Sequence, residues 1–203
     1  TRLHEAAGEA AARRFADNVW TVMVLVQALV LALAFAFMDQ VVGLLAPGFY
    51  ADPEKFALAV DLTRITFPYL FFITLVTLVS GMLNGVGRFA AAAAAPVLLN
   101  VSIVAALLLA WLFPSAAHAA AWGVAAAGVL ELALVYADAA RRGIAPRLAR
   151  PRLDTDMRAF LRALGPAVIG SAGVQIALFA DTIIASMLPT GAVSSIYYAD
   201  RLY

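Results

Sequence analysis

The chain has 203 residues, of which 64% are hydrophobic and 13% are charged, with a formal net charge of +1. A soluble domain usually carries about 25% charged residues, so this composition indicates a protein whose solvent is mostly lipid. The small net charge gives no electrostatic reason to expect a nucleic-acid partner, and the lack of cysteine excludes disulfides, thiol chemistry and cysteine-based metal sites.

Five apolar stretches are long enough, or nearly so, to cross a membrane as helices, which takes about 20 residues each. In chain order they are residues 19–38, 67–83, 90–113, 116–137 and 166–188. A sixth helix is predicted to begin near Ala192, which makes residues 192–203 its truncated start. Residues 1–17 are polar and compatible with a helix. The sequence therefore predicts an all-α, polytopic bundle of transmembrane helices.

The connections between these stretches are short and rich in Pro, Gly and small polar residues, as helical hairpins require. Pro68, Pro96 and Pro166 are expected near the starts of their helices, where a missing N–H costs little. The chain begins without an initiator Met and ends without a helix stop signal. We expect it to be a piece of a longer membrane protein.

Basic residues occur in alternate connections, which predicts the orientation, because short cytoplasmic loops retain Lys and Arg. Arginines precede the first stretch, follow the second at Arg88, and crowd residues 138–165. The first residue is therefore predicted to be cytoplasmic. Within 138–165, apolar residues at helical spacing from Met157 to Leu164 predict an amphipathic helix on the cytoplasmic leaflet, acting as an anchor without a ligand.

Polar side chains form a stripe on two of the predicted spans. On the second the stripe comprises Thr63, Thr66, Thr77, Ser80 and Asn84, beside a Gly81/Gly85 pair; on the fifth it comprises Ser171, Gln175, Thr182 and Ser186. Such stripes either hold helices together or line a hydrated cavity, and packing is the more ordinary reading. Asn100 adds a polar group to the third span. Glu131 is expected to reach the interface by snorkelling.

Asp200 and Arg201 are the most informative charged residues, because they would lie two to three turns inside the sixth helix, where ionised groups usually face a polar interior. Tyr197 and Tyr198 are one turn earlier. The two histidines are far apart, so no metal site is predicted. Neither a phosphate-cradling glycine-rich loop nor a Ser/His/Asp set is present. We expect no catalysis and no cofactor.

The motifs "FPY" at 67–69, "LN" then "RF" between 83 and 89, "LLN" ending at Asn100, and "YYADRL" at 197–202 resemble the MurJ/MviN family of lipid II flippases. The similarity extends from Phe15 onward. It implies part of a two-lobed exporter-type transporter, from its third helix to the start of its eighth. The family's other important charged residues lie in its first two helices, which have no counterpart here.

The resemblance implies a flippase that moves undecaprenyl-linked peptidoglycan precursor from the inner to the outer leaflet of the bacterial cytoplasmic (inner) membrane by alternating access. Its partners would be this lipid-linked precursor, the membrane lipids and the remaining helices of the protein. Asp200 and Arg201 match the family's cavity-lining acid and base, and Asn84, Asn100 and Gln175 are further candidates for substrate binding. Three alternatives stand: an ion-coupled small-molecule or drug antiporter of the same superfamily, a membrane enzyme acting on prenyl-linked substrates, and a non-transporting scaffold.

Overall fold

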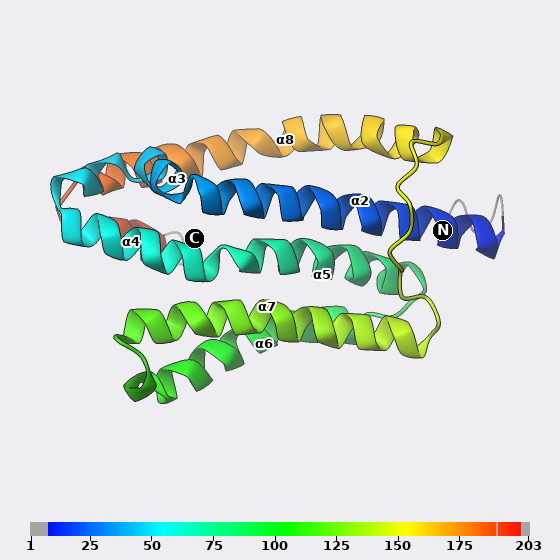
Figure 1. Cartoon of the computed structure of the whole chain (residues 1–203), viewed down its shortest axis with the longest axis horizontal. Coiled ribbons are helices and arrows are strands. Elements are labelled where there is room, and N and C mark those ends of the chain that lie inside the picture. Colours follow the sequence, from blue (N-terminus) through cyan, green and yellow to red (C-terminus); the bar gives the residue numbers. More distant parts are fainter. Residues whose placement is uncertain (1–7, 190, 200–203) are drawn as a thin grey trace.

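The structure is a computed structural model that describes residues 8–189 and 191–199. Within these ranges the regular elements are all helical, and they run in chain order as α2 (Glu9–Ala36), α3 (Met38–Leu45), η1 (Pro47–Ala51), α4 (Pro53–Thr66), α5 (Pro68–Gly85), α6 (Ala90–Leu108), η2 (Ala110–Leu112), α7 (Ala116–Arg141), α8 (Thr155–Ser186) and α9 (Ala192–Ala199). The long helices lie roughly side by side (Figure 1). Five of the helical segments are long and apolar enough to cross a membrane, which confirms the predicted all-α, polytopic fold.

Helix α2 begins well before the predicted first span. The polar stretch that precedes residue 19 is continuous with it, because residues from Glu9 to Asn18 contain neither Gly nor Pro and are rich in Ala and Arg, which favour helix. Gly8, with φ of 81°, stands immediately before the first helical residue. Polar and apolar parts of the sequence thus form one 28-residue helix.

Helices α4 and α5 follow each other with a single residue, Phe67, between them. Pro53 and Pro68 each stand at the first position of their helix, where no intrahelical N–H is needed. The side chain of Asp52 caps α4 by accepting from the backbone N–H of Lys55 at 3.1 Å. The expectation for Pro68 is therefore confirmed, and the chain bends at Phe67–Pro68 because a proline at this position cannot continue the hydrogen bonding of α4.

Helix α8 differs from the sequence-based expectation. The amphipathic segment and the fifth span were expected as two elements, but α8 runs unbroken for 32 residues with Pro166 in its interior. Pro96 likewise lies inside α6. The expectation that these two prolines lie near enough to the starts of their helices to need no N–H was wrong, since both lie inside; transmembrane helices tolerate internal proline because neighbouring groups and local adjustments satisfy the freed carbonyl.

Two glycines of α7 allow neighbouring helices to pack closely against it. Gly123 of α7 faces α6, where an added Cβ would lie 2.9 Å from the Cα atom of Ile103. Gly128 faces α5, where an added Cβ would lie 3.0 Å from the Cβ atom of Phe72. Gly81, expected to pack as part of a small-residue pair, has nothing within 4 Å of its Cβ position. The close contacts therefore come from α7 rather than from the Gly81 surface.

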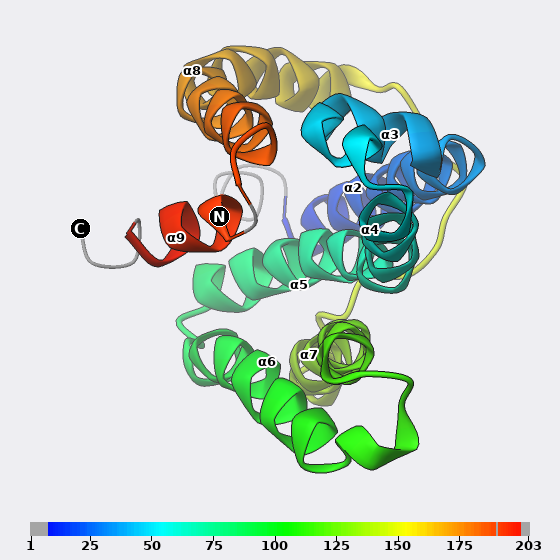
Figure 2. The same ribbon diagram turned by 90° about the vertical axis from the view of Figure 1, so that its left-hand side faces the viewer.

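The buried core lies where α2, α5 and α7 meet, around Leu75, Val79, Leu83 and Val135, all at most 2% exposed. By contrast, α8 stands at the other side of the bundle from α6 and α7 (Figure 2). Near its start, the ring of Phe160 lies 6.0 Å from that of Phe15 in α2. Between 161 and 182 the described side chains of α8 are exposed, apart from a half-buried alanine.

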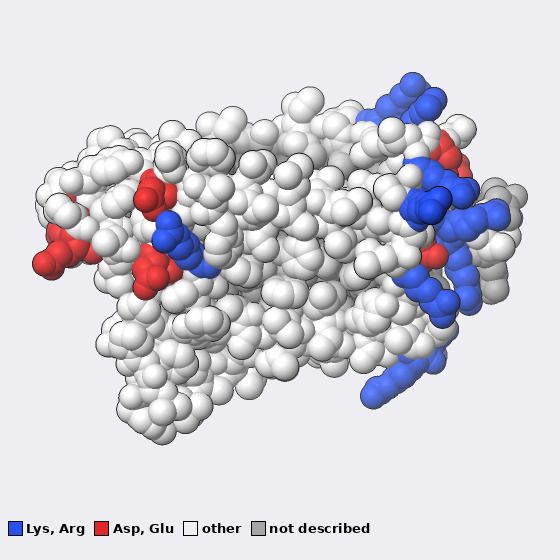
Figure 3. Space-filling model, viewed as in Figure 1, with Lys and Arg blue, Asp and Glu red and all other residues white. Residues whose placement is uncertain are grey.

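Charged residues separate to the two ends of the bundle. Figure 3 shows Lys and Arg gathered where α2 begins and α7 ends, whereas the opposite end, around α3 and α4, is mainly acidic. Two exposed pairs lie at that acidic end: Arg64 with Asp39 at 3.2 Å and His118 with Asp61 at 3.0 Å. The alternation predicted along the sequence thus corresponds to two opposite ends in space. Which end faces the cytoplasm stays a prediction.

Candidate functional site

The predicted acid and base, Asp200 and Arg201, lie outside the described residues. The structure describes the helix that leads to them: α9 follows a turn at Gly191, whose φ is 104°, and packs against α8. Near the end of α9 the rings of Tyr197 and Tyr198 meet edge to face, with centroids 5.9 Å apart. Both tyrosines are more than half exposed. Figure 2 shows α9 on the side of the bundle where α8 stands apart from α5.

The other three predicted site residues are on different helices, and each is exposed. Asn84 lies in the last turn of α5, Asn100 in the middle of α6, and Gln175 in the middle of α8. The amide of Asn100 donates to the carbonyl of Pro96 in its own helix at 3.4 Å. Helices α6 and α8 lie on opposite sides of the bundle in both views (Figures 1 and 2). The described arrangement therefore does not bring Asn100 and Gln175 together, and their role stays a prediction.

The two polar stripes mostly bond back to their own helices. Thr63, Thr77 and Thr182 each donate to the carbonyl four residues earlier, at 2.6 to 2.8 Å. Such bonds satisfy a hydroxyl without any partner helix. Ser186 is different, because it is 4% exposed and its hydroxyl accepts from the backbone N–H of Gly48 in η1 at 3.1 Å. Through this bond Ser186 joins the end of α8 to η1.

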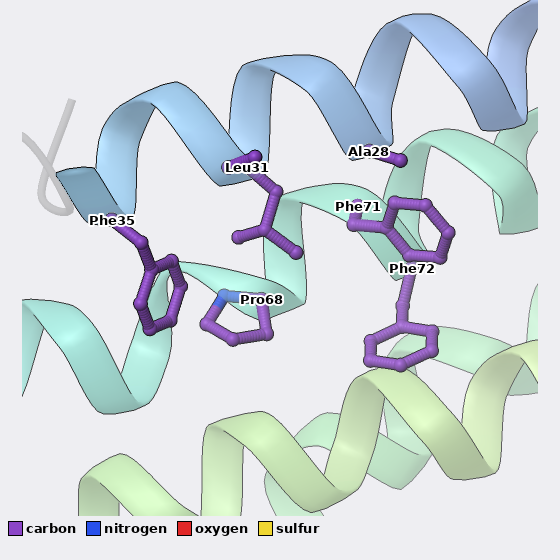
Figure 4. Close-up of a pocket in the computed structure, with 7 residues that line it drawn as sticks. Ala28, Leu31, Phe35, Pro68, Phe71 and Phe72 are labelled. Atoms are coloured by element: carbon purple, nitrogen blue, oxygen red, sulfur yellow. The ribbon is translucent and has the colours of Figure 1, made fainter.

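A shallow groove lies between α2 and α5, and Pro68 is the only one of its lining residues that the sequence analysis names. Its volume is about 500 Å³, and its lining is Ala28, Leu31, Ala32, Phe35, Pro68, Phe71 and Phe72. Figure 4 shows Leu31 and Phe35 of α2 facing Pro68 and Phe71 of α5. The lining is apolar, which suits a hydrocarbon chain rather than a charged head group.

Beside this groove a polar contact joins the same two helices. The amide of Gln27 donates to the hydroxyl of Thr74 at 3.1 Å, at the edge of a second hollow of about 220 Å³. Thr74 also donates to the carbonyl of Leu70 at 2.9 Å. Interhelical bonds of this kind commonly hold transmembrane helices together. Gln27 is a lone polar residue in an apolar run, and this is the signal that could have identified it.

Glu131 does not reach the interface. It is fully buried, at 0% exposure, and its Oε2 atom accepts from the hydroxyl of Tyr69 in α5 at 3.4 Å. The expectation of snorkelling was wrong, since the side chain points into the contact of α5 and α7 rather than along its helix towards the arginines.

An extended strap, residues 144–154, connects α7 to α8 and crosses the early turns of α2 (Figure 1). Asp17, Asn18 and Thr21 hold it: their side chains accept from the backbone N–H groups of Arg147 at 2.7 Å, Arg152 at 2.8 Å and Ala149 at 2.9 Å, respectively. This contact was not predicted from the sequence. The signal that could have identified it is the polar Asp-Asn-x-x-Thr pattern where the first span begins, at residues 17–21.

No group of three or more His, Cys, Asp or Glu that could hold a metal ion occurs among residues 8–189 and 191–199. What the described residues offer is a helical membrane bundle with an exposed helix, a strap, an apolar groove and one buried carboxyl group. These features define a multi-pass helical membrane protein.

Comparison with known proteins identifies the family. The family model described as "Lipid II flippase MurJ" matches residues 2–203. The chain is 42% identical over 204 residues to a probable lipid II flippase MurJ of Rhizobium meliloti (strain 1021), covering 98% of this chain and 38% of the relative. It is 36% identical over 200 residues to the lipid II flippase MurJ of Burkholderia cenocepacia, covering 96% of this chain and 39% of the relative. The chain belongs to the MurJ family, as the sequence motifs predicted, and spans less than two fifths of these curated relatives.

Proposed function

We propose that the intact protein is a flippase that moves undecaprenyl-linked peptidoglycan precursor, lipid II, from the inner to the outer leaflet of the bacterial cytoplasmic membrane. The observation that carries this proposal is the family match over residues 2–203, together with curated relatives named as lipid II flippases. The helical bundle is part of the proposed transporter, and the transport activity is proposed for the whole protein.

The physical problem for such a protein is the anionic head group. A pyrophosphate-linked sugar cannot cross hydrocarbon unaided, because burying an unpaired charge costs many kcal/mol. A transporter lowers this cost with a polar path that contains a cation, while the isoprenoid tail stays in lipid. Arginine suits the task because its planar guanidinium forms two parallel, charge-assisted hydrogen bonds to a phosphate.

In this proposal Arg201 contacts the head group, and Asp200 orients the guanidinium or is released from it as the path changes state. In the sequence, Asp200 and Arg201 come two and three positions after Tyr198, and α9 is described up to Ala199. Asn84, Asn100 and Gln175 are proposed as additional polar contacts. These three residues lie on different helices, and Asn100 and Gln175 lie on opposite sides of the bundle (Figures 1 and 2). They would therefore contact the substrate in separate parts of the path, or in a different arrangement of the helices.

The basic end of the bundle (Figure 3) is proposed to face the cytoplasm, in keeping with the positive-inside rule. The strap and the first turns of α8 would then lie at the inner leaflet, where arginines meet anionic head groups. The acidic end with η1 and α4 would lie at the outer leaflet.

The test is transport by the intact protein with Arg201→Ala, Arg201→Lys and a matched control, Arg150→Ala, in the exposed strap. We expect Arg201→Ala to abolish both support of cell-wall synthesis in depleted cells and the appearance of labelled lipid II in the outer leaflet. Arg201→Lys should retain part of both activities, because lysine keeps the positive charge but cannot form the two parallel hydrogen bonds of a guanidinium. Arg150→Ala should transport normally. Normal transport by Arg201→Ala at equal membrane abundance would remove Arg201 from the mechanism, and an ion-gradient-dependent flux of another solute would favour the antiporter.

A further inference from the structure

The carboxyl group of Glu131 is buried in the contact between α5 and α7 without enough partners for a charge. The residue is 0% exposed, and its single hydrogen bond among the described residues is the one from Tyr69 to Oε2 at 3.4 Å. The other oxygen, Oε1, is buried with no hydrogen-bond partner among residues 8–189 and 191–199. A carboxylate with one long hydrogen bond and no cation beside it would be severely destabilised in such a place.

The helices that pack against α7 offer no compensating cation to this site. Within α5 the only ionisable side chain is Tyr69, and α6 has none between Ala90 and Leu108. In α4, Lys55 lies over the ring of Phe49, 4.2 Å from its centroid, and Asp61 and Arg64 contact His118 and Asp39. His118 belongs to α7 itself but lies more than three turns from Glu131.

The charged groups of α7 and α2 at the basic end are also engaged elsewhere or distant along the bundle. Asp138, about two turns from Glu131, pairs with Arg142 at 3.1 Å. In α2, Asp17 accepts from the backbone N–H of Arg147 in the strap. Arg13 and Arg14 lie about two turns before Trp20. The ring of Trp20 lies 5.8 Å from that of Tyr136, which is itself more than one turn beyond Glu131.

We infer that Glu131 is a proton-binding site: it carries a proton in the packed arrangement of α5 and α7 and releases it when these helices separate and water reaches it. With a proton on Oε1 the group is a neutral carboxylic acid, while the hydroxyl of Tyr69 donates to Oε2. Neutral polar groups cost far less to bury than charged ones. A metal ion does not fit, because cations of the calcium type take about six to eight oxygen ligands and this pocket supplies a single carboxyl group and a phenol.

The position of the site links its protonation to helix packing. Tyr69 is the second residue of α5, directly after the bend at Phe67–Pro68. Gly128, one turn before Glu131, lets Tyr69 and Phe72 come close: an added Cβ would lie 3.0 Å from Phe72 and 3.1 Å from Tyr69. Because the close contact is compatible only with the neutral acid, loss of the proton favours separation of α5 from α7. This inference does not depend on what the intact protein transports.

Infrared spectroscopy of the intact protein in lipid vesicles tests the protonation state directly. At neutral pH we expect the carbonyl stretch of a buried, protonated carboxyl group, and we expect its loss in Glu131→Gln. The control Asp181→Asn, which changes an exposed acid of α8, should keep the band. Tyr69→Phe should keep it but shift it to higher wavenumber, because the donated hydrogen bond is gone. If neither Glu131→Gln nor Tyr69→Phe alters any such band, the inference is wrong.

A distance measurement tests the link to packing. Spin labels at Leu70→Cys in α5 and Val129→Cys in α7 occupy exposed positions close to Tyr69 and Glu131. Raising the pH should lengthen the distance between the labels in the parent protein, and Glu131→Gln should keep the short distance throughout. An unchanged distance in the parent, or the same lengthening in Glu131→Gln, would overturn the coupling of protonation to helix separation.

Discussion

Asn18 and Arg152, which are far apart in sequence, form a two-way contact: the amide of Asn18 donates to the backbone carbonyl of Arg152 at 2.6 Å and its oxygen accepts from the N–H of the same residue at 2.8 Å. Asn18 is 5% exposed, so water cannot easily replace these bonds. The contact holds the strap against α2, two residues before Asp154, which caps the start of α8.

We expect Asn18→Ala to destabilise the protein by about 1–3 kcal/mol, because it leaves the backbone N–H and carbonyl of Arg152 without their part-buried partner. Thermal unfolding in detergent, combined with limited proteolysis of the strap, measures the effect. The matched control is Asn100→Ala, which removes one long bond at an exposed position and should change stability little. Equal stability of the two variants would mean that the strap does not depend on Asn18.

A second prediction concerns the glycine at the closest approach of α6 and α7. Gly123→Ala would place a Cβ 2.9 Å from the Cα atom of Ile103, and backbone cannot move aside as a flexible side chain can. We expect destabilisation of about 1–3 kcal/mol from overpacking. Gly81→Ala is the control, since its Cβ would meet nothing within 4 Å and should stabilise α5 by roughly 0.5–1 kcal/mol. Unfolding of both variants under identical conditions gives the comparison, and a neutral Gly123→Ala would contradict the packing.

The contact between η1 and the end of α8 is the subject of a third prediction. Gly48 lies so close to Ser186 that an added Cβ would be 2.0 Å from its backbone carbonyl oxygen. Gly48→Ala should therefore detach η1 from α8 and expose Ser186, which is otherwise buried. Reactivity of Ser186→Cys towards a small thiol reagent, with and without Gly48→Ala, measures this. Gly170→Ala, at an open position of α8, should leave the reactivity low.

The proposed orientation gives a fourth prediction, helped by the absence of cysteine from this chain. Arg150→Cys and Glu54→Cys place single thiols at exposed positions near the basic and acidic ends, respectively. In intact cells permeable only at the outer membrane, a membrane-impermeant reagent should label Glu54→Cys at once. It should label Arg150→Cys only after the inner membrane is opened. The reverse pattern would invert the topology, because the positive-inside rule sets this assignment.

Some features of the fold follow from residues that are close in sequence. Apolar runs of about 20 residues indicate membrane-spanning helices whatever their neighbours are. Pro68 suits the first position of α5 because proline has no N–H to donate and its φ is already helical. The helix bounds could not be predicted as well: α8 continues through Pro166, because transmembrane helices tolerate an internal proline when neighbouring groups satisfy the freed carbonyl.

The sequence by itself determined that this is a helical membrane protein, how its basic connections alternate, and, through "YYADRL", its family. These properties depend on composition, short motifs and spacing along the chain, and so on residues that are near one another in sequence. Only the tertiary structure decided that Gly123 rather than Gly81 makes a close helix contact, that Asn18 holds the strap, and that Glu131 is buried against Tyr69. Each of these contacts depends on a partner far away in sequence. Whether a buried polar group or a glycine stabilises the fold is decided by the partner that it meets there.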